Sequence, residues 1–137
     1  KAADVAIGIE NVWNRFLLSP LETRRFLDEI SSDYVGMYLD VGNAVYIGYP
    51  EQWIEILGHR IKKLHMSDYR FDQAGIGAFV DLFAGDVDFP AVAKAIAGIG
   101  YDDYITLEML PNYKQFPEVS LYADKYAMNK IIEMIHL

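Results

Sequence analysis

Short apolar runs alternate with longer amphipathic stretches along the chain. The apolar runs lie at residues 5–9, 35–39, 61–64 and 104–107. Most are rich in β-branched residues and lack strict alternation, which is typical of strands covered on both faces of a parallel sheet. Apolar residues at helical spacing follow each run and predict helices over 20–30, 50–57, 88–99 and 118–135.

Local signals support the boundaries of these helices. Ser19 is a suitable N-cap, with Pro20 at the first helical position and Glu22 three residues after the cap. Asp88 is the cap predicted for the third helix, and glycines near residue 100 end it. The segment 69–87 contains three glycines and no clear periodicity, and we expect it to form a long loop.

Four consecutive strand–helix cycles indicate an α/β fold of parallel (βα) units. Parallel neighbours need a crossover connection, which is right-handed in nearly all proteins. Residues 1–137 contain no linker or low-complexity segment. We therefore predict a single domain of about four (βα) units.

Composition narrows the classes of protein and partner. The 137 residues are 53% hydrophobic, contain no cysteine and carry a net charge of −8. Without cysteine, disulfide scaffolds, thiolate zinc sites and cysteine nucleophiles are excluded. The acidic balance argues against nucleic acid and anionic membranes as partners, because both attract basic patches. No apolar stretch reaches the ~18 residues of a membrane span, and we expect a soluble, cytoplasmic protein.

Four potential metal ligands stand at the ends of the four predicted strands: Glu10, Asp40, His65 and Glu108. The carboxyl ends of parallel strands lie at one edge of a sheet, where the functional residues of α/β proteins gather. Taken singly, an acid there is as readily a helix cap, and a histidine an ordinary half-buried side chain. Taken together, three carboxylates and one imidazole predict a site for a divalent cation, Mn²⁺ or Mg²⁺ first, with Co²⁺ or Zn²⁺ as alternatives.

Five short motifs around these strand ends give the chain a family resemblance. They are Ile9-Glu10-Asn11, Leu39-Asp40-Val41-Gly42-Asn43, Leu64-His65-Met66-Ser67-Asp68, Gly85-Asp86-Val87-Asp88-Phe89 and Leu107-Glu108-Met109. In this order and spacing the chain resembles the xylose-isomerase-like sugar isomerases and epimerases, of the tagatose 3-epimerase and L-ribulose-5-phosphate 3-epimerase type. The resemblance covers essentially the whole chain. Some members carry a substrate-binding histidine where Asn43 stands, which leaves the identity of the sugar open.

The resemblance implies a metal-dependent enzyme that moves a proton next to a carbonyl group. The residues that match the family's metal ligands are Glu10, Asp40, His65 and Glu108. The resemblance further implies that Glu10 and Glu108 act as bases on opposite faces of a sugar or sugar phosphate. The metal polarises the carbonyl and stabilises the enediolate, while one carboxylate removes a proton and the other delivers one. Two such groups favour epimerisation slightly, and aldose–ketose isomerisation with one shuttling group stays open.

Three further residues are candidates for substrate binding, each with a structural alternative. Asn43 would bond a sugar hydroxyl or serve as a turn residue. Asp68 would orient the imidazole or a hydroxyl, or cap the loop that follows it. Arg70 would meet the sugar or its phosphate, for which a guanidinium is suited, or stay solvated. We expect Trp13 and Phe16 in the core, with the wall of a sugar pocket as the alternative.

The length of the chain bears on the fold that the family implies. That fold is an eight-stranded (βα)₈ barrel of roughly 250 residues, and about four units match its C-terminal half. We therefore expect a truncated chain or a half-barrel, with two open sheet edges and an uncovered inner face rich in Val, Ile and Leu. It would pair with itself, as a homo-oligomer, or with a missing N-terminal half.

Two other functions are compatible with parts of this pattern. A catalytically silent half-barrel would serve association or bind carbohydrate without turnover. A DNA-repair nuclease similar to endonuclease IV would need three zinc ions and a histidine-rich site. The chain contains only His59, His65 and His136, which together with the acidic charge disfavours a repair function.

Overall fold

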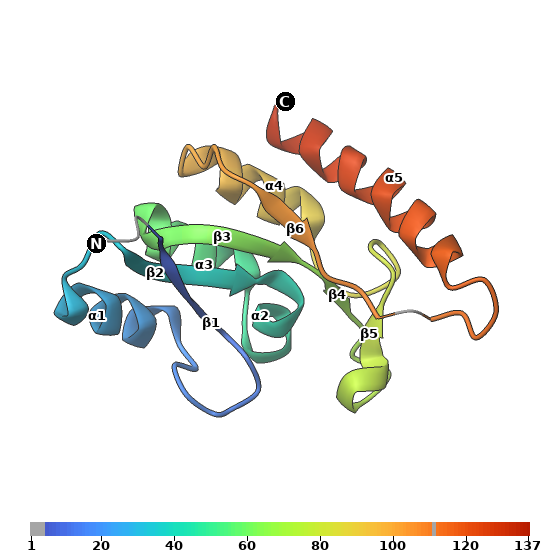
Figure 1. Cartoon of the computed structure of the whole chain (residues 1–137), viewed down its shortest axis with the longest axis horizontal. Coiled ribbons are helices and arrows are strands. Elements are labelled where there is room, and N and C mark those ends of the chain that lie inside the picture. Colours follow the sequence, from blue (N-terminus) through green and yellow to red (C-terminus); the bar gives the residue numbers. More distant parts are fainter. Residues whose placement is uncertain (1–4, 111) are drawn as a thin grey trace.

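Four parallel strands form the central sheet of the protein (Figure 1). The computed structural model describes residues 5–110 and 112–137. In their spatial order the strands are β1 (Ile7–Glu10), β2 (Val35–Asp40), β3 (Ile61–Met66) and β6 (Ile105–Leu107). Each pairs in parallel with the next. This confirms the predicted (βα) arrangement and brings all four carboxyl ends to one edge of the sheet.

Within residues 5–110 and 112–137, five α-helices accompany the sheet, four of them at the positions that the hydrophobic pattern predicts. They are α1 (Pro20–Ile30), α2 (Val41–Ile47), α3 (Pro50–Leu57), α4 (Phe89–Gly98) and α5 (Glu118–Ile135). Helix α1 packs on α3, α3 on α4, and α4 on α5, so these four helices form one layer beside the sheet (Figure 1). A single sheet with one helical layer is the arrangement found along part of the wall of a (βα)₈ barrel.

The helix termini follow the signals in the sequence. The Ser19 hydroxyl accepts a hydrogen bond from the Leu21 amide at 3.2 Å, and the Asp88 carboxylate accepts one from the Ala91 amide at 3.0 Å. Helix α3 ends at Gly58, whose φ of +52° suits a residue without a Cβ atom. These caps satisfy backbone groups that would otherwise lack a partner at the helix ends.

Two short features of the fold lie outside the predicted pattern. Helix α2 has only seven residues, contains a glycine in its first turn and begins directly where β2 ends, so its apolar residues merge with those of the strand. Strands β4 (Asp68–Tyr69) and β5 (Phe79–Val80) pair antiparallel across the predicted loop, and a 3₁₀ turn over Gly75–Ala78 lies between them. Two residues per strand are too few to produce a periodic signal.

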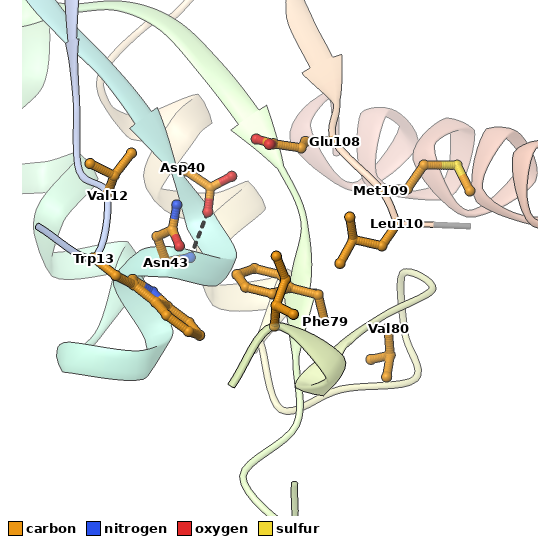
Figure 2. A pocket seen from close by; sticks show the side chains of 10 residues that line it. Val12, Trp13, Asp40, Asn43, Phe79, Val80, Glu108, Met109 and Leu110 are labelled. Atoms are coloured by element: carbon orange, nitrogen blue, oxygen red, sulfur yellow. Dashed lines mark hydrogen bonds between the residues drawn. The ribbon is translucent and has the colours of Figure 1, made fainter. Parts of the chain in front are cut away.

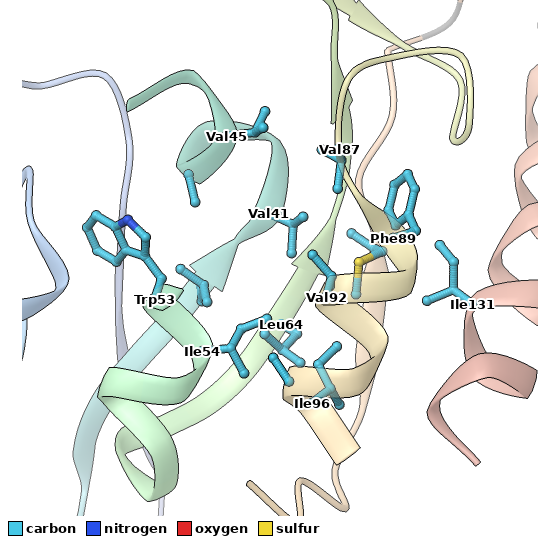
Figure 3. Packing of buried hydrophobic residues seen from close by; sticks show 14 of the residues in the cluster. Val41, Val45, Trp53, Ile54, Leu64, Val87, Phe89, Val92, Ile96 and Ile131 are labelled. Atoms are coloured by element: carbon cyan, nitrogen blue, oxygen red, sulfur yellow. The ribbon is translucent and has the colours of Figure 1, made fainter. Parts of the chain in front are cut away.

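The main hydrophobic core lies between the sheet and the helical layer (Figure 3). The central strands contribute the buried side chains of Met37, Leu39, Leu64 and Met66. The facing helices contribute Trp53, Ile54, Val92, Ile96 and Ile131. Burial of side chains of this size stabilises a fold by about 1.5–3 kcal/mol each, so contact with the helical layer is the main support of the sheet.

The opposite face of the sheet has no helical cover within the described residues, and its composition differs from our expectation. It carries Gly8, Tyr38, Lys63, His65 and Thr106. The Tyr38 hydroxyl donates to Thr106 Oγ1 at 3.1 Å, and Lys63 forms an ion pair with Asp103. The prediction of an open face rich in Val, Ile and Leu is wrong. Side chains alternate along a strand, and the buried apolar set points to the helices.

Both outer strands keep a free edge in the part of the chain that the structure describes. Strand β1 pairs only with β2, and β6 only with β3. Ile7 on β1 is 58% exposed, consistent with an edge that lacks a neighbour. Within the same residues, no helix combines the length and apolar character that crossing a bilayer demands.

Candidate metal centre

The four residues at the strand ends converge on one point. They are Glu10, Asp40, His65 and Glu108, and each offers one ligand atom, all within 4.8 Å of one another. The His65 Nδ1 atom is 3.0 Å from Glu10 Oε1 and 2.8 Å from Glu108 Oε2. It is 4.0 Å from Asp40 Oδ2. Three carboxylates around one imidazole nitrogen are a donor set that suits a divalent cation.

The register of the strands explains this convergence. Asp40 and His65 are direct partners on β2 and β3, so their side chains point the same way from adjacent strands. Thr106 is the partner of His65 on β6, and Glu108 lies two residues further along on the same face. The Glu108 amide donates to the Met66 carbonyl at 3.0 Å, which extends the ladder beyond the end of β6. Alternation along parallel strands therefore gathers the side chains at one edge.

Burial differs widely among the four side chains. The Asp40 side chain is 1% exposed, whereas that of Glu108 is 53% exposed. Burial raises the pKa of the Asp40 carboxyl to about 7, with a smaller contribution from the negative charge of Glu108, although hydrogen bonds from Asn43 and Ser67 oppose the rise. A cation would stabilise the anionic form of such a carboxyl group. The electrostatics of the cluster therefore fit a bound metal ion.

Two buried polar residues beside the cluster are absent from the sequence-based candidates. Asn11 follows Glu10, and Ser67 stands two residues after His65. Both form hydrogen bonds with Asp40. Their signal in the sequence is position alone, because each lies in a motif that also contains a proposed ligand, and a polar residue directly after a buried strand needs a partner.

A pocket of about 240 Å³ opens beside the cluster (Figure 2). Its lining consists of Val12, Trp13, Asp40, Asn43, Ile76, Phe79, Val80, Glu108, Met109 and Leu110. The rings of Trp13 and Phe79 form an apolar wall, with 5.5 Å between their centroids. Asp40 and Glu108 add carboxylate oxygen atoms to the lining. An apolar wall that faces a few polar groups is the usual form of a small-molecule site.

The aromatic residues after β1 occupy other positions than we expect from the sequence. Trp13 lines this pocket and is exposed, so a core position is wrong and the pocket-wall alternative describes it. Phe16 is also exposed and packs edge-on against Phe26, with 5.6 Å between the ring centroids. Both belong to the connection between β1 and α1, which loops outward beyond the strand end (Figure 1).

The pocket includes one of the three predicted substrate-binding residues. Asn43 lines it, and its backbone amide donates to Asp40 Oδ1 at 2.5 Å (Figure 2). Asp68 is fully buried and accepts hydrogen bonds from three backbone amides at 2.8–3.2 Å, which favours its loop-capping alternative. Arg70 does not line the pocket and forms a two-bond ion pair with Asp72 in the same loop. Of these three residues, the structure therefore brings only Asn43 to the pocket beside the four strand-end residues.

Solved structures share this fold over most of the chain. A D-tagatose 3-epimerase-like protein superposes with a TM-score of 0.76 at 22% identity, over 96% of this chain and 48% of its own. A D-allulose 3-epimerase from Methylomonas sp., in complex with D-allulose, gives 0.67 at 21% identity, over 96% and 47%. The IOLI protein, with a bound zinc atom, gives 0.71 at 19% identity, over 82% and 43%. This chain spans less than half the length of these three structures.

Sequence comparison identifies the family. No curated protein sequence matches the chain. A sequence model of the xylose isomerase-like TIM barrel matches residues 1–128, which include all four strands of the central sheet and the helices α1 to α4 in full. On this match, the chain belongs to the xylose isomerase-like TIM-barrel family.

Proposed function

We propose that this chain carries the metal site and the proton-transferring carboxylates of a divalent-metal-dependent epimerase or isomerase of sugars or sugar phosphates. The observation that carries the proposal is the convergence of three carboxylates and one imidazole beside a pocket. The 3-epimerases among the structural relatives support the reaction class.

The ion would be held by Glu10, Asp40, His65 and Glu108. An oxygen-rich set with one imidazole favours Mn²⁺, and Mg²⁺, Co²⁺ and Zn²⁺ are alternatives. The zinc atom in the IOLI protein supports a metal on this fold but does not select one for this chain. When bound, the cation would polarise the substrate carbonyl and so acidify the neighbouring C–H bond.

We assign the proton transfer to Glu10 and Glu108. Their carboxylates approach His65 Nδ1 from the two outer strands of the sheet, so a sugar carbon bound between them would present a different face to each. One carboxylate takes the proton, the C–H electron pair forms a C=C bond, and the carbonyl π pair moves to the oxygen. The other carboxyl group returns a proton to the opposite face and inverts that carbon. In an isomerisation, one of the two would carry the proton between neighbouring carbons.

The substrate would occupy the pocket beside the cluster. Asn43 offers a side-chain amide to a sugar hydroxyl, and the rings of Trp13 and Phe79 offer apolar surface to C–H bonds. We assign no substrate contact to Asp68 or Arg70, because hydrogen bonds within the loop already occupy both side chains.

A complete active site would need further strands. This chain spans less than half of each reported relative, and β1 and β6 keep a free edge within the described residues. We propose that four more (βα) units close the barrel, supplied by an N-terminal half or by a second copy of the chain. Metal binding would then belong to this half, and turnover to the closed barrel.

Calorimetric titration with Mn²⁺ tests the metal site. We expect one ion per chain. Glu10→Gln and Glu108→Gln should each weaken binding by about tenfold or more, because each removes an anionic ligand. Glu55→Gln changes an exposed glutamate on α3 and should bind Mn²⁺ as the unmodified chain does. Absence of saturable binding by the unmodified chain would refute the proposal.

Solvent deuterium tests the proton transfer. In D₂O the closed barrel should convert a ketose to its 3-epimer and place deuterium on carbon 3, which NMR detects directly. Either Glu→Gln substitution should abolish epimerisation, since inversion at carbon 3 needs both acid–base groups. Turnover that is indifferent to both substitutions would contradict the assignment.

A second function has one observation in its favour. The two free sheet edges suit a half-barrel that serves association or binds carbohydrate without turnover. Sugar binding to such a protein would be indifferent to EDTA, whereas the enzyme proposal requires the metal. Calorimetric titration of the protein with a sugar, with and without EDTA, therefore separates the two functions.

A further inference from the structure

Asn11 fixes the backbone of Asp40 from the neighbouring strand. Its Oδ1 accepts a hydrogen bond from the Asp40 amide at 2.8 Å, and its Nδ2 donates to the Asp40 carbonyl at 2.9 Å. Strand β1 ends at Glu10, and the Asn11 side chain continues the ladder to β2 in place of a peptide group. Asn11 is buried, so water does not compete for these bonds.

Ser67, the residue directly after β3, fixes the side chain of Asp40. Its hydroxyl lies 3.0 Å from both carboxylate oxygens of Asp40 and accepts a hydrogen bond from the Gly42 amide at 3.1 Å. A Cβ atom at Gly42 would lie 2.3 Å from Ser67 Oγ, so glycine is what allows this approach. All three residues of this network, Asp40, Gly42 and Ser67, are buried.

The two carboxylate oxygens of Asp40 differ in their hydrogen bonds. The Asn43 amide occupies Oδ1 at 2.5 Å. For Oδ2, the atom that faces His65, the Ser67 hydroxyl is the one hydrogen-bond partner within the described residues. Glu108 has no comparable support, since its side chain is exposed and contacts the cluster through His65 Nδ1 at 2.8 Å.

We propose that Asn11 and Ser67 are positioning residues, which fix the backbone and the carboxylate of Asp40 in place before the metal arrives. The inference rests on the proposed metal site and adds the residues that prepare it. Partners that orient a metal ligand typically change metal affinity by 10–100-fold when they are removed. Both residues bind Asp40, and neither forms a hydrogen bond with Glu108. Asp40 would therefore be oriented before the metal binds, whereas Glu108 would take its final position with the metal.

Metal titration of the Ser67→Ala variant tests the proposal. We expect its Mn²⁺ affinity to fall by roughly 10–100-fold. The visible absorption spectrum of the Co²⁺-loaded variant should also change, because the Ser67 hydroxyl would no longer orient the Asp40 carboxylate. Gly42→Ala displaces the Ser67 hydroxyl without removing it and should shift both readouts in the same direction. Asn11→Ala should lower the Mn²⁺ affinity as well. If the Asn11→Ala protein does not fold, the Ser67→Ala and Gly42→Ala variants test the proposal by themselves.

Ser120→Ala is the matched control. Ser120 is a buried serine on α5 whose hydroxyl has no hydrogen-bond partner within the described residues, so its loss should leave Mn²⁺ affinity and the Co²⁺ spectrum unchanged. If Ser67→Ala and Gly42→Ala also bind both ions as the unmodified chain does, the positioning role is overturned and the metal site stands. If the unmodified chain binds neither ion, the proposed function falls and this inference falls with it.

Discussion

The carboxylate of Asp40 serves two parts of the structure. Its Oδ1 accepts the Asn43 amide and caps α2, while its Oδ2 faces the imidazole of His65. Formation of the helix therefore also turns the carboxylate toward the cluster. This sharing explains why a short helix begins directly at the end of β2.

The metal-free protein should lose stability as pH rises from about 4 to above 7. Burial raises the pKa of Asp40 from 3.8 to about 7 in the folded state, so the fold retains this proton where the unfolded chain has released it. The stabilisation is complete below the unfolded pKa and is lost as pH rises through the folded pKa. Thermal unfolding in EDTA at a series of pH values measures this trend.

Asp40→Asn is the control for this pH dependence, since asparagine is also a good N-cap and does not titrate. Its unfolding midpoint should vary less with pH than that of the unmodified chain. Burial also raises the pKa of Asp68 and Asp124. The dependence of the unfolding midpoint on pH should therefore become weaker in Asp40→Asn without disappearing. Saturating Mn²⁺ should oppose the trend, because protons compete with metal for the carboxylate. Equal slopes for the two proteins would count against this account of Asp40.

For single residues, the sequence predicts the proposed metal ligands but not the residues that form hydrogen bonds with them. Acidic residues and a histidine at strand ends are visible because the apolar runs reveal where each strand ends. The bonds from Asn11 and Ser67 to Asp40 depend on three strands lying in register. That register is a tertiary property, which neighbouring residues in the chain do not encode.

Among the elements, the β4–β5 ribbon supplies part of the pocket wall, and Asp68 holds it in place. The Asp68 carboxylate accepts hydrogen bonds from the amides of Tyr69, Gly85 and Val87. A Cβ atom at Gly85 would lie 2.2 Å from Asp68 Oδ1, so the close approach requires glycine. Phe79 on β5 reaches the pocket from this ribbon.

Asp68→Ala should lower the free energy of unfolding by roughly 3 kcal/mol, because buried amides lose their acceptor. Urea titration measures the loss, and proteolysis between residues 70 and 87 should accelerate. Asp72→Ala removes an exposed acid of the same loop, paired with Arg70, and should cost less than about 1 kcal/mol. Losses of similar size in both variants would show that Asp68 has no special role in the loop.

Element prediction succeeds where the signals are local. Helices α1 and α4 carry a side-chain cap and an apolar stripe, and both appear where the pattern places them. Helix α2 has a local cap in Asp40 but is too short to show a periodic stripe. The β4–β5 ribbon depends on the buried carboxylate of Asp68, whose amide partner at Gly85 lies 17 residues away in the chain. Short elements of this kind are specified by tertiary contacts more than by periodicity.

In the whole molecule, the free edges of β1 and β6 are the features that call for a neighbour. We expect the isolated chain to self-associate and to show a light-scattering mass above its 15.6 kDa. Ile7→Lys puts a charge on the edge strand and should shift the chain toward the monomer. Leu21→Lys on α1 removes a side chain of similar exposure, 56% against 58%, and should leave the mass unchanged. A monomeric mass for the unmodified chain would exclude self-association.

The polar open face of the sheet has a consequence for how this half meets another. Tyr38, Lys63 and Thr106 form hydrogen bonds or ion pairs there, so water already wets the surface and its burial yields little hydrophobic gain. Recognition would then rest on the backbone rims of β1 and β6, where hydrogen bonds have a direction. A partner strand has to match the row of N–H and C=O groups on such a rim, so backbone geometry restricts the partner before any side chain is compared.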